Sequence, residues 1–211
     1  MREPPDRRAI RDTYEKIADH FADTRQHGWD EVLEFLSACP HGRTGIDIGA
    51  ANGRHLPALS SVVDQPIALD LSRPLLTRGR EDFGGLQVEW VEGDASNLPI
   101  ANSTIDIAIA IATYHHLPTQ ADRLQSFNEL ARVLSPAGIA LISVWSITHN
   151  KFNGTEATDA TVPWTLPSGE TIERYYHLYD LESFEHDIQL STLSHTTCYE
   201  SGGNLYAVVG P

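Results

Sequence analysis

The residues with the clearest chemical potential lie in two short segments, each at the end of an apolar run. In the segment Asp47-Ile48-Gly49-Ala50-Ala51-Asn52-Gly53, small residues recur after an acid, and Asp70 ends the next apolar run, seventeen positions beyond Gly53. Small residues let a ligand approach the backbone, and an acid at this spacing accepts hydrogen bonds from both hydroxyls of a ribose. The pattern predicts a nucleotide-type site. We expect Ala51 to keep a negative φ, because a β-carbon disfavours the left-handed region.

These segments need a sheet to position them. Alternating apolar runs and helical patterns predict an α/β fold, a doubly wound and mostly parallel seven-stranded sheet that closes with an antiparallel hairpin. We expect one domain over residues 1–211. The expected strands are Gly45–Ile48, Ile67–Leu71, Val88–Val91, Ile105–Ala112, Ile139–Trp145, Ser191–Tyr199 and Leu205–Val209.

Two further parts of the chain lie outside this alternation. Residues of about 6–38 predict an N-terminal helical cap, with a helical stripe around Tyr14 and Phe21 and a second helix over Asp30–Ala38. Residues of about 146–175 form a substrate-side insertion, and the polar stretch Ser146–Thr171 predicts a long loop. A loop of this length inside a compact domain is usually functional or mobile.

The composition narrows the functional class. The net charge is −14 with only two lysines, which argues against non-specific nucleic-acid binding and favours a salty cytoplasm, where a highly acidic surface stays hydrated. No apolar run is long enough to span a membrane, and the first residues carry no apolar signal segment, so we expect a cytoplasmic protein. Cys39 and Cys198 match no metal-ligand spacing, and we expect no metal in this chain.

The turn after the first strand has the form D-x-G-x-A-x-G and resembles the first motif of class I S-adenosylmethionine-dependent methyltransferases. The resemblance implies S-adenosylmethionine as the cofactor, with Asp94 and Ala95 near its adenine. Ligands of open α/β sheets lie at the carboxyl ends of strands, which places Ile111 and Ala112 beside the cofactor. The expected cofactor-binding residues are Asp47, Gly49, Ala51, Gly53, Asp70, Leu71, Asp94, Ala95 and Ile111.

Several other runs resemble one family within that class. They are Phe21-Ala22-Asp23-Thr24-Arg25, Trp29, Ile109-Ala110-Ile111-Ala112-Thr113-Tyr114-His115-His116, Val144-Trp145 and Arg174-Tyr175-Tyr176-His177-Leu178. Together they resemble the tRNA wobble-uridine carboxymethyl methyltransferases, from about Tyr14 to Val208, and fit an archaeal-type member. The resemblance implies esterification of a carboxymethyl group on uridine 34 in the tRNA anticodon loop. The loop around Ala157–Glu170 has no counterpart among these motifs.

Ester formation on a carboxylate suits the available side chains. The substrate carboxylate is already ionised, so the enzyme needs orientation and cationic contacts more than a strong base. A guanidinium is planar and permanently charged, so Arg25 and Arg174 are the candidates to hold the carboxymethyl group. His116 and Tyr176 are expected to orient the base or the carboxylate. The alternatives are that Arg25 pairs with a surface acid, that the Arg-Tyr-Tyr-His run is a packed turn, and that one of the paired histidines has a packing or capping role.

The resemblance also implies a partner. The eukaryotic family member works with a small zinc-ribbon activator protein, which adds a strand beside the third strand and carries any zinc. Here that edge would present Leu86, Val88 and Trp90 on one face, and a partner strand would cover an apolar edge. The alternative is that a neighbouring helix covers these three residues.

Two other functions stay open from the sequence. A small-molecule methyltransferase of the quinone-biosynthesis type would act without tRNA and would not require both Arg25 and Arg174. A non-catalytic cofactor-binding subunit of an RNA-modifying complex would bind the cofactor without turnover.

Overall fold

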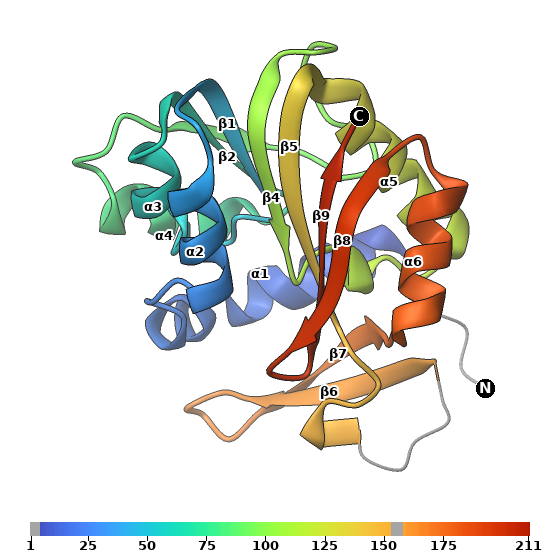
Figure 1. The fold of residues 1–211 in the computed structure, drawn as a ribbon. Coiled ribbons are helices and arrows are strands. Elements are labelled where there is room, and N and C mark those ends of the chain that lie inside the picture. The colour runs from blue at the N-terminus through green and yellow to red at the C-terminus, as the bar shows by residue number, and fades with distance from the viewer. Residues whose placement is uncertain (1–4, 153–157) are drawn as a thin grey trace.

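The computed structural model describes residues 5–152 and 158–211 and is built around one large sheet. Its seven strands lie in the order β3-β2-β1-β4-β5-β9-β8 (Figure 1). The first five are parallel, and β9 and β8 are antiparallel to their neighbours. This confirms the expected sheet and its closing hairpin. The strands are β1 (Gly42–Ile48), β2 (Val63–Asp70), β3 (Glu89–Glu92), β4 (Ile105–Ile111), β5 (Leu134–Trp145), β8 (Ser194–Ser201) and β9 (Asn204–Gly210).

Helices cover both faces of this sheet because its central strands are apolar on both sides. One face packs on α5 (Gln120–Val133) and α6 (Leu181–Leu190) through residues such as Phe127 and Phe184. The other packs on α2 (Asp30–Ala38), α3 (Leu56–Ser60) and α4 (Arg73–Asp82), with Leu36 and Leu56 in its core. Figure 1 shows these two layers on either side of β4 and β5.

The polar stretch after β5 is not the long loop that its composition predicts. It contains a short helical turn, η2 (Asn150–Phe152), and an antiparallel pair, β6 (Asp159–Thr165) and β7 (Thr171–His177), in a separate two-stranded sheet. Val162 and Trp164 are buried between exposed residues, and Arg174 and Tyr176 on the opposite strand are buried between exposed or half-buried ones. The composition of this segment does not reveal the two-residue alternation of a strand, because many of its residues are polar and face water.

The helix α1 (Arg7–Thr24) lies across the lower end of the sheet, between the sheet and the β6–β7 pair (Figure 1). Its Arg7 binds Asp94 at 3.0 Å, and its Lys16 binds Glu170 in the β6–β7 turn at 2.5 Å. This helix therefore covers the carboxyl ends of the parallel strands, where ligands of α/β folds bind.

Within residues 5–152 and 158–211, no helix is long and apolar enough to cross a bilayer. The same residues contain no group of three or more His, Cys, Asp or Glu side chains that could hold a metal ion.

Candidate active site

The turn between β1 and α3 has the backbone that its small residues suggest. Gly49, Ala51 and Gly53 have φ values of +75°, +51° and +81°. The expectation of a negative φ at Ala51 is therefore wrong, because the turn holds this alanine in the left-handed region. Asp70 fixes the turn by accepting hydrogen bonds from the amides of Ala51 and Ser72, each at 2.8 Å. Burial raises the pKa of Asp70, and these backbone hydrogen bonds oppose the rise.

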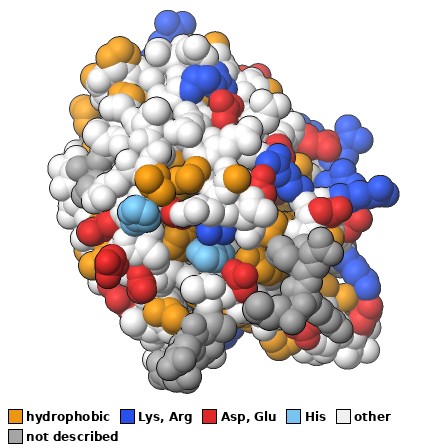
Figure 2. All heavy atoms as spheres, turned by 90° about the vertical axis from the view of Figure 1, so that its right-hand side faces the viewer, with side chains coloured by type: hydrophobic (Ala, Val, Ile, Leu, Met, Phe, Trp, Pro, Cys, Tyr) orange, Lys and Arg blue, Asp and Glu red, His pale blue; other side chains and the backbone are white. Residues whose placement is uncertain are grey.

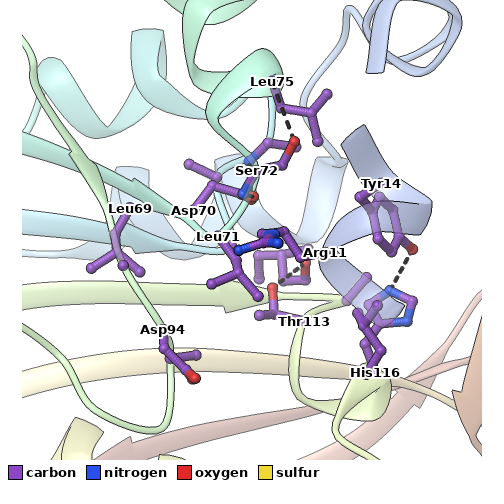
Figure 3. A pocket seen from close by; sticks show the side chains of 18 of the residues that line it. Arg11, Tyr14, Leu69, Asp70, Leu71, Ser72, Leu75, Asp94, Thr113 and His116 are labelled. Atoms are coloured by element: carbon purple, nitrogen blue, oxygen red, sulfur yellow. Dashed lines mark hydrogen bonds between the residues drawn. The ribbon is translucent and has the colours of Figure 1, made fainter. Parts of the chain in front are cut away.

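A pocket opens where β1, β2 and β4 end (Figure 3). Most of the expected cofactor residues line it: Gly49, Ala51, Asp70, Leu71, Asp94, Ala95 and Ile111. Gly53 does not line the pocket. A β-carbon there would come within 2.5 Å of Leu56 and 2.9 Å of Trp90, so this glycine permits close packing beneath the turn. At Gly49 a β-carbon would come within 2.2 Å of Thr113, which also lines the pocket.

Asp47, which lies outside the lining, is buried beside it and lacks a full set of hydrogen bonds. One of its carboxylate oxygens has no partner within the described residues, and the nearest ring nitrogen, Nδ1 of His55, is 3.9 Å away. Burial raises the pKa of Asp47 to about 7, and Arg54 opposes the rise. Burial and Arg54 together lower the pKa of His55 to about 3, so this imidazole is neutral.

Arg54 lines the pocket although sequence reasoning did not select it. Its guanidinium lies 4.8 Å from the centroid of the Trp29 ring, and burial lowers its pKa to about 10. The sequence does contain one indication of Arg54, which is that it directly follows Gly53. A basic residue after a glycine turn is common enough that position alone does not identify it.

The pocket wall opposite Asp70 comes from α1, through Ile10, Arg11 and Tyr14. Figure 3 shows the Tyr14 hydroxyl pointing at the His116 ring. Nε2 of His116 lies 2.7 Å from this hydroxyl, and Nδ1 lies 2.9 Å from the carbonyl oxygen of Tyr175. A carbonyl only accepts, so Nδ1 carries the proton and Nε2 accepts from Tyr14. Burial lowers the pKa of His116 to about 4. Tyr14 was read only as part of a helical stripe.

The neighbouring His115 has a packing role. It is fully buried, and its Nδ1 accepts a hydrogen bond from the amide of Trp145 at 2.9 Å. Burial holds its pKa well below the ordinary value. The Tyr176 ring packs 4.9 Å from His115 and 4.6 Å from His116, and it stacks on Trp145 at 4.4 Å. The two expected residues His116 and Tyr176 are thus in direct contact.

The guanidinium groups of Arg25 and Arg174 both make cation–π contacts with the ring of Trp164. Their guanidinium carbons are 5.3 Å and 4.7 Å from the centroid of Trp164. Arg174 is 4% exposed and its Nε has no hydrogen-bond partner among the described residues. Within that part of the chain neither arginine has a carboxylate oxygen within 4.0 Å, whereas the buried Arg123 pairs with Asp187 at 3.6 Å. The structure therefore does not support the alternative in which Arg25 pairs with a surface acid.

Asn52 connects the cofactor turn to Arg25. Its side chain is buried, and its Nδ2 donates to the Arg25 carbonyl oxygen at 3.1 Å. A second contact reaches the carbonyl oxygen of Ala22 at 3.5 Å. The turn that lines the pocket is therefore bonded to the end of α1 that carries Arg25.

The proposed partner edge is the free side of β3, which pairs only with β2. The strand begins at Glu89, so Leu86 and Val88 precede it, and all three apolar residues are half-buried. The Trp90 ring lies against Gly79 of α4, where a β-carbon on the glycine would come within 2.4 Å of it. Trp90 therefore helps to pack the fold, which was the alternative weighed for it.

Comparison with known proteins agrees with this geometry. Residues 46–142 match the model of a methyltransferase domain. The tRNA (carboxymethyluridine(34)-5-O)-methyltransferase of Arabidopsis thaliana is 34% identical over 81% of this chain and 39% of its own length. The protein of the same name from Saccharomyces cerevisiae is 33% identical over 77% of this chain and 58% of its own, so the chain spans about two fifths and three fifths of these relatives. That from Schizosaccharomyces pombe is 30% identical over 81% of this chain and 82% of its own length.

Solved structures share the fold at low identity. The DhpI complex with SAH has a TM-score of 0.76 at 17% identity, and covers 97% of this chain and 96% of that one. A chain in the complex between the Haloferax volcanii Trm112 methyltransferase activator and the putative methyltransferase has a TM-score of 0.72 at 16% identity, over 95% and 96%. From these sequence relationships, the chain belongs to the tRNA (carboxymethyluridine(34)-5-O)-methyltransferase family, and its domain is that of an S-adenosylmethionine-dependent methyltransferase.

Proposed function

We propose that this chain esterifies the carboxymethyl group of a modified uridine at position 34 of tRNA. The observation that carries the proposal is the pair Arg25 and Arg174, two guanidinium groups without carboxylate partners among the described residues. Neither lines the pocket, but both lie next to it. Arg25 is 5.6 Å from the ring of Phe21, which belongs to the lining, and Arg174 is 5.3 Å from the ring of Tyr176, which packs on His116. A buried cation without a counter-ion is costly, and a carboxylate substrate would supply that counter-ion.

The pocket residues fit the cofactor. Asp70 suits a ribose, and the apolar residues around it suit an adenosyl group. Asp47, with its unpartnered oxygen, and Arg54 provide opposite charges for an amino acid moiety. S-adenosylmethionine, when bound, supplies a methyl group on a positively charged sulfur.

The residues of this chain then have mainly positioning roles. Arg25 and Arg174 bind the substrate carboxylate and leave one of its oxygens free to attack the methyl carbon. With S-adenosylmethionine bound, an O–C bond would form as the S–C bond breaks, and no proton would have to move because the carboxylate is ionised throughout. His116 is neutral and fixed by two hydrogen bonds, so it contributes orientation rather than base catalysis.

We also propose that a small zinc-ribbon activator protein pairs with the free edge of β3 to form a heterodimer. The support is an edge strand with unpaired backbone groups and half-buried apolar neighbours. Val88→Glu tests this better than any change at Trp90, because Trp90 packs against Gly79. Leu33→Glu, at an exposed leucine on α2, is the matched control. We expect Val88→Glu alone to lose the complex, and an intact complex would refute the assignment.

The negative surface limits how RNA can approach. Figure 2 shows acidic side chains scattered over the face that is on the right in Figure 1, with Lys and Arg gathered mainly toward one side of it. A chain of net charge −14 does not attract RNA over its whole surface, so binding has to use such local groups or the partner.

The function is tested by transfer of labelled methyl from S-adenosylmethionine to tRNA from a strain that lacks this gene, with and without the co-expressed partner. We expect label that mild base removes, as from an ester, and loss of transfer in Arg25→Gln and Arg174→Gln. Absence of label with cofactor binding intact would favour a small-molecule substrate or a non-catalytic subunit.

A further inference from the structure

Trp164, on β6, has no role in the mechanism described so far, yet it contacts both arginines of the site. Its side chain is largely buried at 9% exposure. The guanidinium carbons of Arg25 and Arg174 lie 5.3 Å and 4.7 Å from its ring centroid. Both distances fall within the range of attraction between a cation and an aromatic ring.

The Trp164 ring is held by α1. Its Nε1–H donates to Nδ1 of His20 at 3.1 Å, and its centroid is 5.5 Å from that of Phe21. His20 and Phe21 are on the same helix, one turn before Arg25. The ring therefore has a defined position relative to Arg25, which caps the end of α1, and to Arg174 on β7.

The electrostatics explain why an indole suits this position. Arg25 and Arg174 repel one another, and burial together with the charge of Arg174 lowers the pKa of Arg25. A carboxylate between them would relieve the repulsion, but it would also occupy their N–H donors. An aromatic face offers negative potential without taking those donors, so both guanidinium groups remain able to bind a substrate anion.

We propose that Trp164 is a positioning residue that holds Arg25 and Arg174 apart without itself occupying their N–H donors, and so determines selectivity for an anionic carboxymethyl group over a neutral amide of the same shape. Of these donors, Nη1 of Arg25 binds the Thr24 carbonyl oxygen at 3.0 Å. The inference rests on the proposed function, because it assigns a determinant of substrate recognition to the same site.

The test compares two ligands of the same shape, of which one carries a negative charge and the other a neutral amide with an NH2 donor in its place. Binding of 5-carboxymethyluridine and 5-carbamoylmethyluridine, each within the same tRNA anticodon stem-loop, is measured by calorimetry with S-adenosylhomocysteine present, so that no transfer occurs. We expect Trp164→Leu to reduce the preference for the carboxylate about tenfold, which corresponds to the loss of one to two cation–π contacts. Trp164→Phe, which keeps a ring, should retain most of the preference.

Two further variants separate positioning from folding. Thr161→Ala, at an exposed position on the same strand, should leave the preference unchanged. His20→Ala removes the acceptor of the indole N–H and the edge contact between the two rings, whose centroids are 5.4 Å apart, and should reduce the preference partially, even where Trp164→Leu does not fold. An unchanged preference in a folded Trp164→Leu, or in His20→Ala should the leucine variant not fold, would overturn the proposal. A wild-type protein without any preference, or without methyl transfer, would instead refute the proposed function.

Discussion

Tyr14 on α1 donates its hydroxyl hydrogen to Nε2 of His116 across 2.7 Å, so a helix outside the sheet fixes the tautomer of an imidazole after β4. The other ring nitrogen donates to the Tyr175 carbonyl oxygen, which leaves the imidazole no free lone pair. The same histidine thus joins three separate segments of the chain around the pocket.

Tyr14→Phe should lower the free energy of unfolding by about 1 kcal/mol, because Nε2 of His116 loses its donor in a buried setting. We expect methyl transfer to slow as well, because the Tyr14–His116 pair lines the pocket and Tyr14 fixes the orientation of the imidazole. Urea unfolding and methyl-transfer kinetics measure the two effects. Tyr199→Phe is the control, because no hydrogen bond of the Tyr199 hydroxyl is found among the described residues. Equal effects of both changes would contradict the assignment.

Cofactor affinity should rise with pH through about 7, where Asp47 ionises. The pKa of Asp47 is raised in the folded protein, so its carboxyl is neutral below that pH and attracts the ammonium group of the cofactor only above it. The same raised pKa means that this group contributes stability at low pH that is lost as pH rises from about 4 to about 7. Calorimetric titration at several pH values measures the affinity. Asp47→Asn should remove this pH dependence, and a profile that survives the change would assign it elsewhere.

Ala51→Gly should increase the free energy of unfolding by up to about 1 kcal/mol, because Ala51 has φ +51° and glycine adopts that region without strain. Ala50→Gly is the matched control. Ala50 is buried in the same turn and is not among the residues of positive φ, so its loss should destabilise the protein. Thermal unfolding distinguishes the two, and a lower melting temperature for Ala51→Gly would show that the strain is relieved in another way.

Arg174→Met should stabilise the protein by about 1–2 kcal/mol while abolishing methyl transfer, because a buried cation without a counter-ion costs more than a methionine of similar size. Arg123→Met, in contrast, should destabilise the protein. Arg123 is equally buried but faces Asp187, and its removal leaves that carboxylate without its cation. Denaturant unfolding of both variants provides the comparison. A destabilised Arg174→Met would mean that the arginine already has a partner in solution.

Stability should rise with KCl toward molar concentrations, since a net charge of −14 produces self-repulsion that salt screens. The midpoint of urea unfolding at low and at high KCl measures this. A protein that is fully folded and active at low salt would contradict adaptation to a saline cytoplasm.

Local chemistry made much of the site predictable. The strand–turn–strand pattern around Gly49 and Asp70 depends on residues close in sequence, and most of the cofactor residues expected from the sequence do line the pocket. Tyr14 could not be selected, because a tyrosine on an amphipathic helix looks the same whether it fills a core or faces a ligand. The conformation of Ala51 could not be predicted either, since its strain is offset by the hydrogen bond that its amide donates to Asp70, which only the folded chain contains.

The β6–β7 pair shows a second reason for failure. Its polar residues made the segment look like a loop, whereas Val162 and Trp164 mark one buried face. Trp90 was expected at a partner surface, and the structure turns its ring toward α4. Which side of an edge strand a helix covers depends on the tertiary arrangement rather than on the strand's own pattern.

The hydrogen bond from Asn52 to the Arg25 carbonyl oxygen has a thermodynamic consequence for the order of events. A ligand that orders the turn after β1 also reduces the entropy that remains to be lost when Arg25 is immobilised. By linkage, occupancy of either subsite then strengthens the other by the same factor. Cofactor and acceptor would therefore bind cooperatively. The methylated product has lost its negative charge, so it would bind more weakly near Arg25, and the affinity for the spent cofactor would fall with it.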